Sequence, residues 1–196
     1  MSNVKANIIN ITNKDSLQNA AEILKKGGIF VFPTDTVYGV GCALNDIAIR
    51  KLYKIKKRSL AQPTAILISR KLIPRICSSE NWGLDIPHNI QKGFEKGNIT
   101  LLIQQDKFEF EISGMLLKNN KIGVRIPNQE WLQKLLSIVG PIVASSANKK
   151  GEPAPKTYHE IDRAIMGEAD LVIKTAQKGS GQPSTIYDLE QKIYLR

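Results

Sequence analysis

The chain has 196 residues, of which 28 are Lys or Arg and 18 are Asp or Glu, so its formal net charge is +10. The length suits one domain of ordinary size, and a 42% share of hydrophobic residues with only 2 cysteines excludes wholesale disorder, a disulfide framework and a four-cysteine zinc site. No apolar run approaches the roughly 20 residues of a membrane span, and no signal-peptide pattern opens the chain. We therefore expect a cytoplasmic protein without a membrane partner, whose positive charge favours anions such as nucleotides or nucleic acid.

Short apolar runs alternate with amphipathic stretches, a pattern that predicts an α/β or α+β domain with a mixed sheet. Asp15 or Ser16 is expected to cap a first helix that ends at Gly27-Gly28, and Asp46 is expected to cap the second. The second helix is expected at residues 46–58, and two more are expected at residues 130–139 and 157–166. Expected strands occupy residues 29–32, 64–68, 99–103, 121–126, 142–144, 171–173 and 185–189.

A polar segment follows the first of these strands directly. It reads Pro33-Thr34-Asp35-Thr36-Val37-Tyr38-Gly39-Val40-Gly41. Ligands of open α/β sheets bind beyond the strand ends, and the hydroxyls of Thr34 and Thr36 can donate or accept hydrogen bonds. The segment therefore predicts a ligand site, while a threonine-rich turn beside a packing tyrosine is the alternative interpretation.

The second helix carries a lysine on its apolar face. Helical spacing of i, i+3, i+4 and i+7 relates Ile49, Leu52, Tyr53 and Lys56. Such a lysine either extends its ammonium to water or meets an anion in a cleft, and Arg58 lies near enough to bind the same polyphosphate. Between Asp46 and Glu80 there is no acidic residue, so a solvated basic face and a salt-dependent RNA-binding patch remain open interpretations.

Two later segments are also candidates for anion binding. Arg125 stands in an apolar strand and needs an anionic partner if it points inward, whereas on an edge strand it would face water. Small polar side chains follow the next strand in Ser145-Ser146-Ala147-Asn148, and such clusters form both phosphate sites and ordinary turns. The same applies to residues 179–185. The sequence contains no Walker A motif, no dinucleotide-binding glycine motif after a strand and no His/Cys cluster.

Taken together, these segments resemble the threonylcarbamoyl-AMP synthase family, whose members contain the YrdC-like domain. The likeness covers residues 7–196 as a single domain, the short form of the family. Five motifs carry it in the family's order: Pro33 to Gly39, Lys56-Lys57-Arg58, Arg125 with Pro127, Ser145-Ser146-Ala147-Asn148 with Gly151, and Pro183-Ser184-Thr185. The resemblance implies an α/β (α+β) fold in which helices flank a twisted mixed β-sheet with a basic concave surface.

The resemblance also implies an activity, that of a nucleotidyltransferase. L-threonine, bicarbonate and ATP would give threonylcarbamoyl-AMP and pyrophosphate, the first step of threonylcarbamoyladenosine modification of tRNA. Mg²⁺ would arrive with ATP and keep its waters; no protein carboxylate is evident as its ligand, and Asp35 remains a possible ligand for which the sequence gives no support. The implied partners are the three substrates, a downstream threonylcarbamoyl-transferase complex and, as an open question, tRNA itself.

Residue roles follow position by position from the resemblance. It implies a threonine site formed by Thr34, Thr36, Tyr38, Arg125 and Ser184. It implies a nucleotide site formed by Lys56, Arg58, Thr100, Ser146, Asn148 and Arg196. Lys56 and Arg58 would also be catalytic, because they would neutralise charge on the phosphates.

Two other functions remain as alternatives. One is an RNA-binding module without chemistry; the other is a related carbamoyl-adenylate enzyme with another acceptor, because the domain also occurs in hydrogenase maturation proteins. Lys56 on an inward face and Arg125 in an apolar strand favour a small anionic ligand over RNA. Missing acylphosphatase-like and zinc-finger-like segments weigh against the second alternative.

Overall fold

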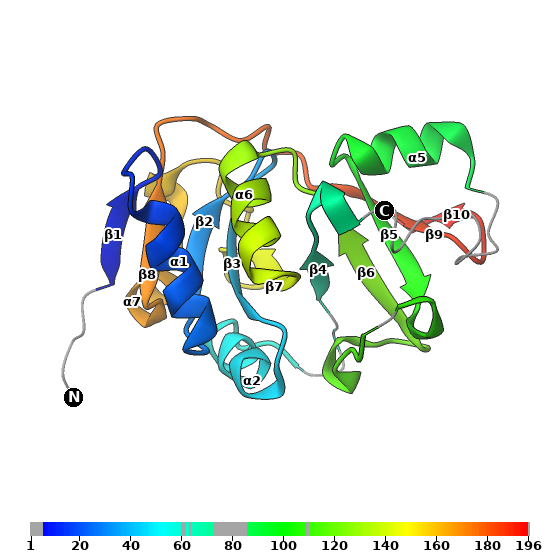
Figure 1. The fold of residues 1–196 in the computed structure, drawn as a ribbon, viewed down its shortest axis with the longest axis horizontal. Helices are drawn as coiled ribbons and strands as arrows, with labels where there is room; N and C mark the ends of the chain where they lie inside the picture. Colours follow the sequence, from blue (N-terminus) through cyan, green and yellow to red (C-terminus); the bar gives the residue numbers. More distant parts are fainter. Residues whose placement is uncertain (1–5, 60–61, 63, 73–85, 109, 196) are drawn as a thin grey trace.

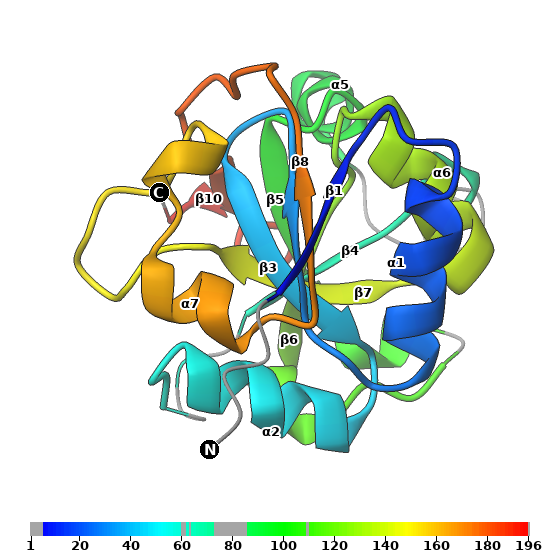
Figure 2. The same ribbon diagram turned by 90° about the vertical axis from the view of Figure 1, so that its left-hand side faces the viewer.

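The computed structural model describes residues 6–59, 62, 64–72, 86–108 and 110–195. Its strands form one ten-stranded mixed sheet in the order β1-β8-β2-β3-β7-β4-β6-β5-β9-β10, which twists strongly from one edge to the other (Figures 1 and 2). The strands are β1 (Asn7–Asn10), β2 (Phe30–Pro33), β3 (Tyr38–Ala43), β4 (Ala65–Leu67), β5 (Ile99–Gln104), β6 (Lys121–Arg125), β7 (Ile142–Ser146), β8 (Leu171–Lys174), β9 (Thr185–Asp188) and β10 (Ile193–Tyr194). The mixed, helix-flanked sheet confirms the predicted fold class.

Helices cover both faces of this sheet. They are α1 (Ser16–Lys25), α2 (Asp46–Ile55), α5 (His88–Glu95), α6 (Glu130–Val139) and α7 (Arg163–Glu168), with short 3-10 turns at Arg70–Leu72, Gln105–Lys107, Gly114–Leu116 and Tyr158–Glu160. Figure 2 shows α1 and α6 on one side of the sheet and α2 and α7 on the other. Among the described residues, no helix has both the length and the apolar character needed to cross a membrane.

The alternation of side chains along β2 shows how the two faces are filled. Phe30 and Phe32 stack with ring centroids 4.4 Å apart and pack under α1 and α6, whereas Val31 points into the core on the side of α2. All three side chains are fully buried, so this strand is covered on both faces, as its unbroken apolar run predicts. It is therefore a rigid support for the polar segment that follows it.

Strand β3 was missed because its glycines are typical of a loop. A Cβ at Gly39 would lie 2.9 Å from the Phe32 ring, and one at Gly41 would lie 2.5 Å from the carbonyl oxygen of Val143. These glycines therefore allow β3 to pack closely against its neighbours rather than to turn. Strands β1 and β10, both at edges of the sheet, were also missed.

Several predicted helix ends need correction. Asp15 makes no side-chain cap bond, and Ser16 instead donates to the carbonyl of Ile11 and accepts from the Trp131 indole, which joins α1 to α6. The cap of α2 is Asn45, not Asp46, because the Asn45 side chain accepts from the N–H of Ala48 at 3.0 Å.

The helix expected at 157–166 is divided in two. The Asp162 side chain accepts from the N–H groups of Ala164 and Ile165 at 2.8 and 3.1 Å, so it starts α7 anew after a 3-10 turn. A capping residue inside an apolar helical pattern thus marks a boundary.

The C-terminal end of α2 turns sharply, and α2 ends at Ile55 rather than at 58. Lys57 adopts a left-handed conformation with φ of 47°. The N–H of Arg58 then bonds to the carbonyl of Tyr53 at 2.9 Å, and that of Lys57 to the carbonyl of Lys54 at 3.0 Å, the two bonds that close a helix in this conformation. The turn directs Arg58 toward β7.

We expect Lys57→Gly to raise the free energy of unfolding by about 0.5–1 kcal/mol, because glycine adopts the left-handed conformation without a Cβ clash. Urea denaturation followed by circular dichroism measures the change. Lys54→Gly is the matched control: Lys54 is an exposed lysine inside the same helix, where glycine should lower the stability by about 1 kcal/mol. Equal losses in the two variants would contradict the assigned turn.

Candidate functional site

The face of the sheet that carries α1 and α6 is hollowed where it continues over β4, β6 and β5. Residues 125 and 100 are ladder partners, as are 125 and 67, so their side chains lie on this face. A cavity of about 290 Å³ opens there. Most of the predicted site residues line it: Thr34, Thr36, Arg58, Thr100, Arg125, Ser146 and Ser184.

The turn between β2 and β3 forms one wall of the cavity. The Thr34 hydroxyl donates to the carbonyl of Val37 at 2.6 Å, accepts from the N–H groups of Thr36 and Val37, and lies 3.0 Å from the Thr36 hydroxyl. The N–H of Gly181 bonds to the carbonyl of Thr36 at 2.8 Å and supports the turn from behind. Thr34 therefore shapes the turn, and its bonds hold Thr36 in a fixed position.

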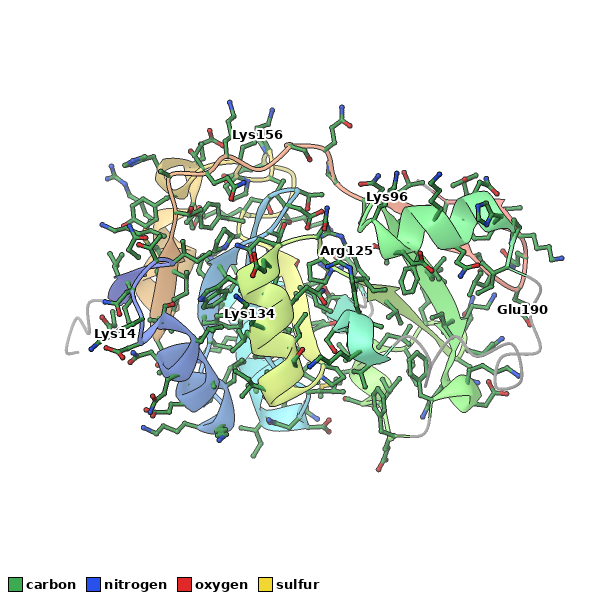
Figure 3. The ribbon with its side chains drawn as sticks, turned by 45° about the horizontal axis from the view of Figure 1, so that its top comes forward. Lys14, Lys96, Arg125, Lys134, Lys156 and Glu190 are labelled. Atoms are coloured by element: carbon green, nitrogen blue, oxygen red, sulfur yellow. The ribbon has the colours of Figure 1, made fainter. Side chains whose placement is uncertain are left out.

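Arg125 points inward and is 7% exposed, which excludes the solvent-facing alternative. Its Nη2 lies 2.8 Å from Oδ2 of Asp35, and its Nε donates to the carbonyl of Gly97 at 3.0 Å. Burial lowers the pKa of Arg125, and the charge of Asp35 opposes that effect. Figure 3 shows Arg125 near the middle of the molecule, between α6 and α5.

Asp35 is the anionic partner that a buried Arg125 requires. The sequence showed the need for such a partner but did not identify it. Oδ1 of Asp35 accepts from the N–H of Asn128 at 3.0 Å while Oδ2 faces Arg125. Both carboxylate oxygens thus make hydrogen bonds within the protein.

A second contact closes the cavity from the C-terminal part of the chain. The hydroxyls of Thr100 on β5 and Ser184 lie 2.7 Å apart. Residues 99 and 185 are ladder partners in neighbouring parallel strands, which explains why these distant motifs meet. Hydroxyl groups from three segments therefore border the cavity that Arg125 also lines.

Lys56 is 9% exposed; it follows α2 directly as its C-terminal cap residue and continues the buried face of the helix, as the helical spacing predicts. Its ammonium donates to the carbonyl of Ser146 at 2.6 Å and to that of Asn148. It does not line the first cavity; it lines an adjoining one of about 200 Å³, together with Arg58 and Ser146, which border both. Lys149 and Lys150 also border this second cavity, and the sequence interpretation did not assign them to the site.

The surroundings of Lys56 lower the pKa of its ammonium group. Burial, and next the charge of Arg58, lower the pKa of Lys56 to about 8, although the charges of Asp162 and Glu152 act in the opposite direction. Arg58 itself donates from Nε to the carbonyl of Gln62 at 2.6 Å. A polyanion placed between Lys56 and Arg58 would relieve their mutual repulsion.

Asn148 holds the loop after β7 and offers one unused acceptor. Its Nδ2 donates to the carbonyl of Glu152 at 2.5 Å. Its Oδ1 is buried and is the only buried side-chain polar atom without a hydrogen-bond partner in the part of the chain that the structure describes. A buried acceptor of this kind is costly unless a ligand or water satisfies it.

One described site residue that was predicted, Tyr38, lines neither of these two cavities. Tyr38 was expected in the threonine site, but on β3 it faces the opposite side from Gly39; its side chain is buried in the core, and its hydroxyl accepts from the N–H of Thr175 at 3.0 Å. The two-residue period of a strand sends adjacent side chains to opposite faces. Arg196 lies outside the described residues.

The hollow continues toward β9 as a further cavity of about 430 Å³, which shares Thr64 and Thr100 with the first. Lys121 borders it and forms ion pairs with Asp188 at 2.8 Å and Glu190 at 2.6 Å. The sequence interpretation missed this group, although Lys121 occurs in the same apolar strand as Arg125.

The arrangement suits the alignment of anions rather than covalent catalysis. Among the described residues, no group of three or more His, Cys, Asp or Glu side chains could hold a metal ion. Burial raises the pKa of the Cys42 thiol to about 12, which keeps it protonated and unreactive. What remains is a set of fixed cations and hydroxyls around adjoining cavities.

The chain matches the family Sua5_yciO_yrdC, described as Telomere recombination, over residues 22–196. A Methanocaldococcus jannaschii relative, provisionally named threonylcarbamoyl-AMP synthase, is 32% identical over 183 residues, which cover 91% of this chain and 84% of the relative. The threonylcarbamoyl-AMP synthase of Pseudomonas fluorescens is 28% identical over 180 residues, covering 91% of this chain and 95% of that protein.

Solved structures share the fold. The crystal structure of P. abyssi Sua5 complexed with L-threonine matches with a TM-score of 0.77 at 27% identity, over 93% of this chain and 54% of that one. This chain therefore spans about half the length of P. abyssi Sua5. E. coli YciO matches with a TM-score of 0.74 at 22% identity, over 97% of this chain and 93% of that one, which supports the fold alone.

Proposed function

Since the chain belongs to the Sua5, YciO and YrdC family, we propose that it is a nucleotidyltransferase that forms threonylcarbamoyl-AMP and pyrophosphate from L-threonine, bicarbonate and ATP. The observation that carries the proposal is the convergence of Arg125, the Thr34–Thr36 turn, Arg58 and Ser146 on one cavity. The P. abyssi relative that binds L-threonine supports the choice of amino acid.

The amino acid would lie beside Arg125. Within the described residues, the Nη1 group of Arg125 has no protein partner, and its two N–H groups can donate to the α-carboxylate. The hydroxyls of Thr36 and Ser184 border the same cavity and suit the threonine hydroxyl. Each of these hydroxyls already has a protein partner, Thr34 for Thr36 and Thr100 for Ser184, and a hydroxyl can make a further hydrogen bond to a ligand.

The triphosphate would lie over Arg58, Ser146 and the adjoining cavity. Lys56 fixes the carbonyl groups of Ser146 and Asn148, so its removal would disturb the loop as well as the charge. Lys149 and Lys150 extend the positive rim of this second cavity. The ATP and threonine halves share Ser146 and Arg58, which brings their reacting groups into one space.

The reaction then needs alignment and charge neutralisation. The threonine amine adds to bicarbonate with loss of water and gives a carbamate, and a carbamate oxygen attacks the α-phosphorus of ATP. The bond from that phosphorus to the bridging oxygen breaks, and pyrophosphate leaves with the electron pair. Arg58 and Lys56 stabilise the charge that develops on the phosphates.

Mg²⁺ fits this site as an ion carried by ATP. The absence of an acidic cluster from the described residues leaves the phosphates and water as its ligands. When bound, it would neutralise phosphate charge. Asn148 Oδ1, the buried acceptor without a partner, suits a water molecule of the ion's shell.

ATP affinity is expected to fall as the pH rises above about 8, because the pKa of Lys56 is lowered to about 8 in the free protein and a bound polyanion raises it. Below that pH the lysine is charged in both states; above it, binding takes up a proton. Calorimetry in buffers of different ionisation enthalpy measures the uptake. Lys56→Arg stays charged, so it should bind ATP without the uptake, and an unchanged pH profile in that variant would contradict the assignment.

The direct test is pyrophosphate release from ATP and bicarbonate with single amino acids. Release that depends on threonine supports the proposal, and release with another acceptor supports the related carbamoyl-adenylate alternative. Affinity for tRNA without turnover supports an RNA-binding module. Under the proposal the protein acts in the cytoplasm, and its labile product passes to a threonylcarbamoyl-transferase that modifies tRNA.

A further inference from the structure

Asp35 lies where its own turn meets three segments that are far apart in the sequence: residues 125–128, the chain at Ser180 and the turn at Gly97. Its Oδ2 lies 2.8 Å from Nη2 of Arg125 at the end of β6, and its Oδ1 accepts from the N–H of Asn128, just before α6. Its own carbonyl accepts from the N–H of Ser180 at 3.0 Å. The third of these segments is the turn at Gly97, whose carbonyl accepts from Nε of Arg125.

The turn at Gly97 fits closely around this carboxylate. Gly97 has φ of +82°, and a Cβ there would lie 3.1 Å from Oδ2 of Asp35 and 2.8 Å from the carbonyl oxygen of Ile126. Glycine is therefore required both for the left-handed backbone and for the close approach. The backbone around the ion pair of Asp35 and Arg125 therefore leaves little room for either side chain to change position.

These contacts hold two of the three guanidinium nitrogens. Nε is fixed by Gly97 and Nη2 by Asp35, which leaves Nη1 without a partner among the residues that the structure describes. A guanidinium is planar and rigid, so fixing Nε and Nη2 also fixes where Nη1 lies. Arg125 borders the cavity of about 290 Å³.

We propose that Asp35 is the positioning residue for substrate carboxylate binding: it holds Arg125 in the single orientation that offers Nη1 to the α-carboxylate of the amino acid, and it ties the Thr34–Thr36 turn to the same guanidinium. This inference rests on the proposed function, which supplies the amino acid substrate. Asp35 does not touch the substrate; it acts through Arg125.

A purely charge-neutralising role is the alternative. In that case any carboxylate near Arg125 would serve, and its exact placement would be immaterial. The observed carboxylate is instead divided between Arg125 and a backbone N–H, which fixes its orientation. Asp35→Glu separates the two roles, because it keeps the charge and moves the carboxylate.

Calorimetry with threonine and with ATP tests the proposal on folded variants of the full chain. Asp35→Asn is expected to weaken threonine binding at least tenfold and Asp35→Glu at least fivefold, with ATP affinity changed less than twofold in both. Asp170→Asn is the matched control: Asp170 accepts from the N–H of Ile29 at 2.7 Å, at the other end of β2, and threonine affinity should stay within twofold. Wild-type threonine affinity in Asp35→Glu would overturn the positioning role.

A double variant adds a second criterion. In an Arg125→Lys background, Asp35→Asn should change threonine affinity less than twofold, because Asp35 acts through the guanidinium. If Asp35→Asn weakens threonine binding by the same factor in the Arg125→Lys background as in the wild-type protein, the proposal is overturned.

Hydrogen exchange of the Arg125 Nε–H, assigned by its absence in Arg125→Lys, gives a readout that needs no substrate. Asp35→Asn should accelerate this exchange at least tenfold, and Asp170→Asn should leave it unchanged; unchanged exchange in Asp35→Asn overturns the proposal. If wild-type protein neither binds threonine nor releases pyrophosphate, the proposed function fails, and the exchange rate still decides whether Asp35 positions Arg125.

Discussion

Arg125→Ala is expected to abolish measurable threonine binding and to leave ATP affinity nearly unchanged. Loss of a charged hydrogen bond to a carboxylate removes about 1.5–3 kcal/mol, and loss of the fixed guanidinium also frees the turn that Asp35 joins to it. Calorimetry with each ligand measures the two affinities separately. Equal losses for threonine and ATP would contradict the assignment of Arg125 to the amino acid.

The same variant is expected to be less stable, because it leaves a carboxylate that is only 16% exposed without its counter-ion. Breaking such a pair from one side costs about 3–5 kcal/mol when it is fully buried, and partial exposure of Asp35 reduces that figure. The double variant Asp35→Asn with Arg125→Ala removes the unpaired charge. It should recover stability in urea denaturation without recovering threonine binding, which separates the binding defect from misfolding.

Lys56→Ala is expected to lower the rate of pyrophosphate release by about 30-fold to 1,000-fold, which corresponds to roughly 2–4 kcal/mol of transition-state stabilisation. The ammonium both holds the carbonyl groups of Ser146 and Asn148 and adds its charge beside Arg58. Steady-state kinetics with ATP varied at saturating threonine and bicarbonate measures the effect.

Lys54→Ala is the matched control for this prediction. Lys54 lies on the same helix and is exposed, and its removal should change the rate less than twofold. Lys56→Arg keeps a cation at the same place and should retain more activity than Lys56→Ala. An unchanged turnover rate in Lys56→Ala would remove Lys56 from the site.

The sequence predicted the site residues best where the spacing of apolar neighbours along the chain indicates which way a side chain points. Helical periodicity placed Lys56 on the inward face of α2, and the structure confirms its burial. The apolar neighbours of Arg125 required an anionic partner if it pointed inward, and the structure supplies one. The sequence interpretation gave Asp35 no supported role, although it stands between two of the expected site threonines.

Local pattern was misleading where strands pack unusually closely. No strand was expected over residues 38–43, and the family resemblance placed Tyr38 in the threonine site, whereas the alternative interpretation from the residues was a packing tyrosine. Because residues 38–43 form a strand, alternation sends Tyr38 into the core and Gly39 toward the cavity. The glycines are there for the space they leave to Phe32 and β7, and no local propensity contains that information.

The sequence by itself determined seven of the ten strands of the sheet and the kinds of side chain at their ends, because periodicity and capping act within a few residues of the chain. Only the tertiary structure decided which of those ends meet. Asp35 and Arg125 are 90 residues apart, and Lys56 and Ser146 are also 90 apart. Their contacts follow from the strand order, which places β7 beside both β3 and β4 and joins β4 to β6. That order results from burial of all the apolar faces at once, a property of the whole chain and not of any one segment.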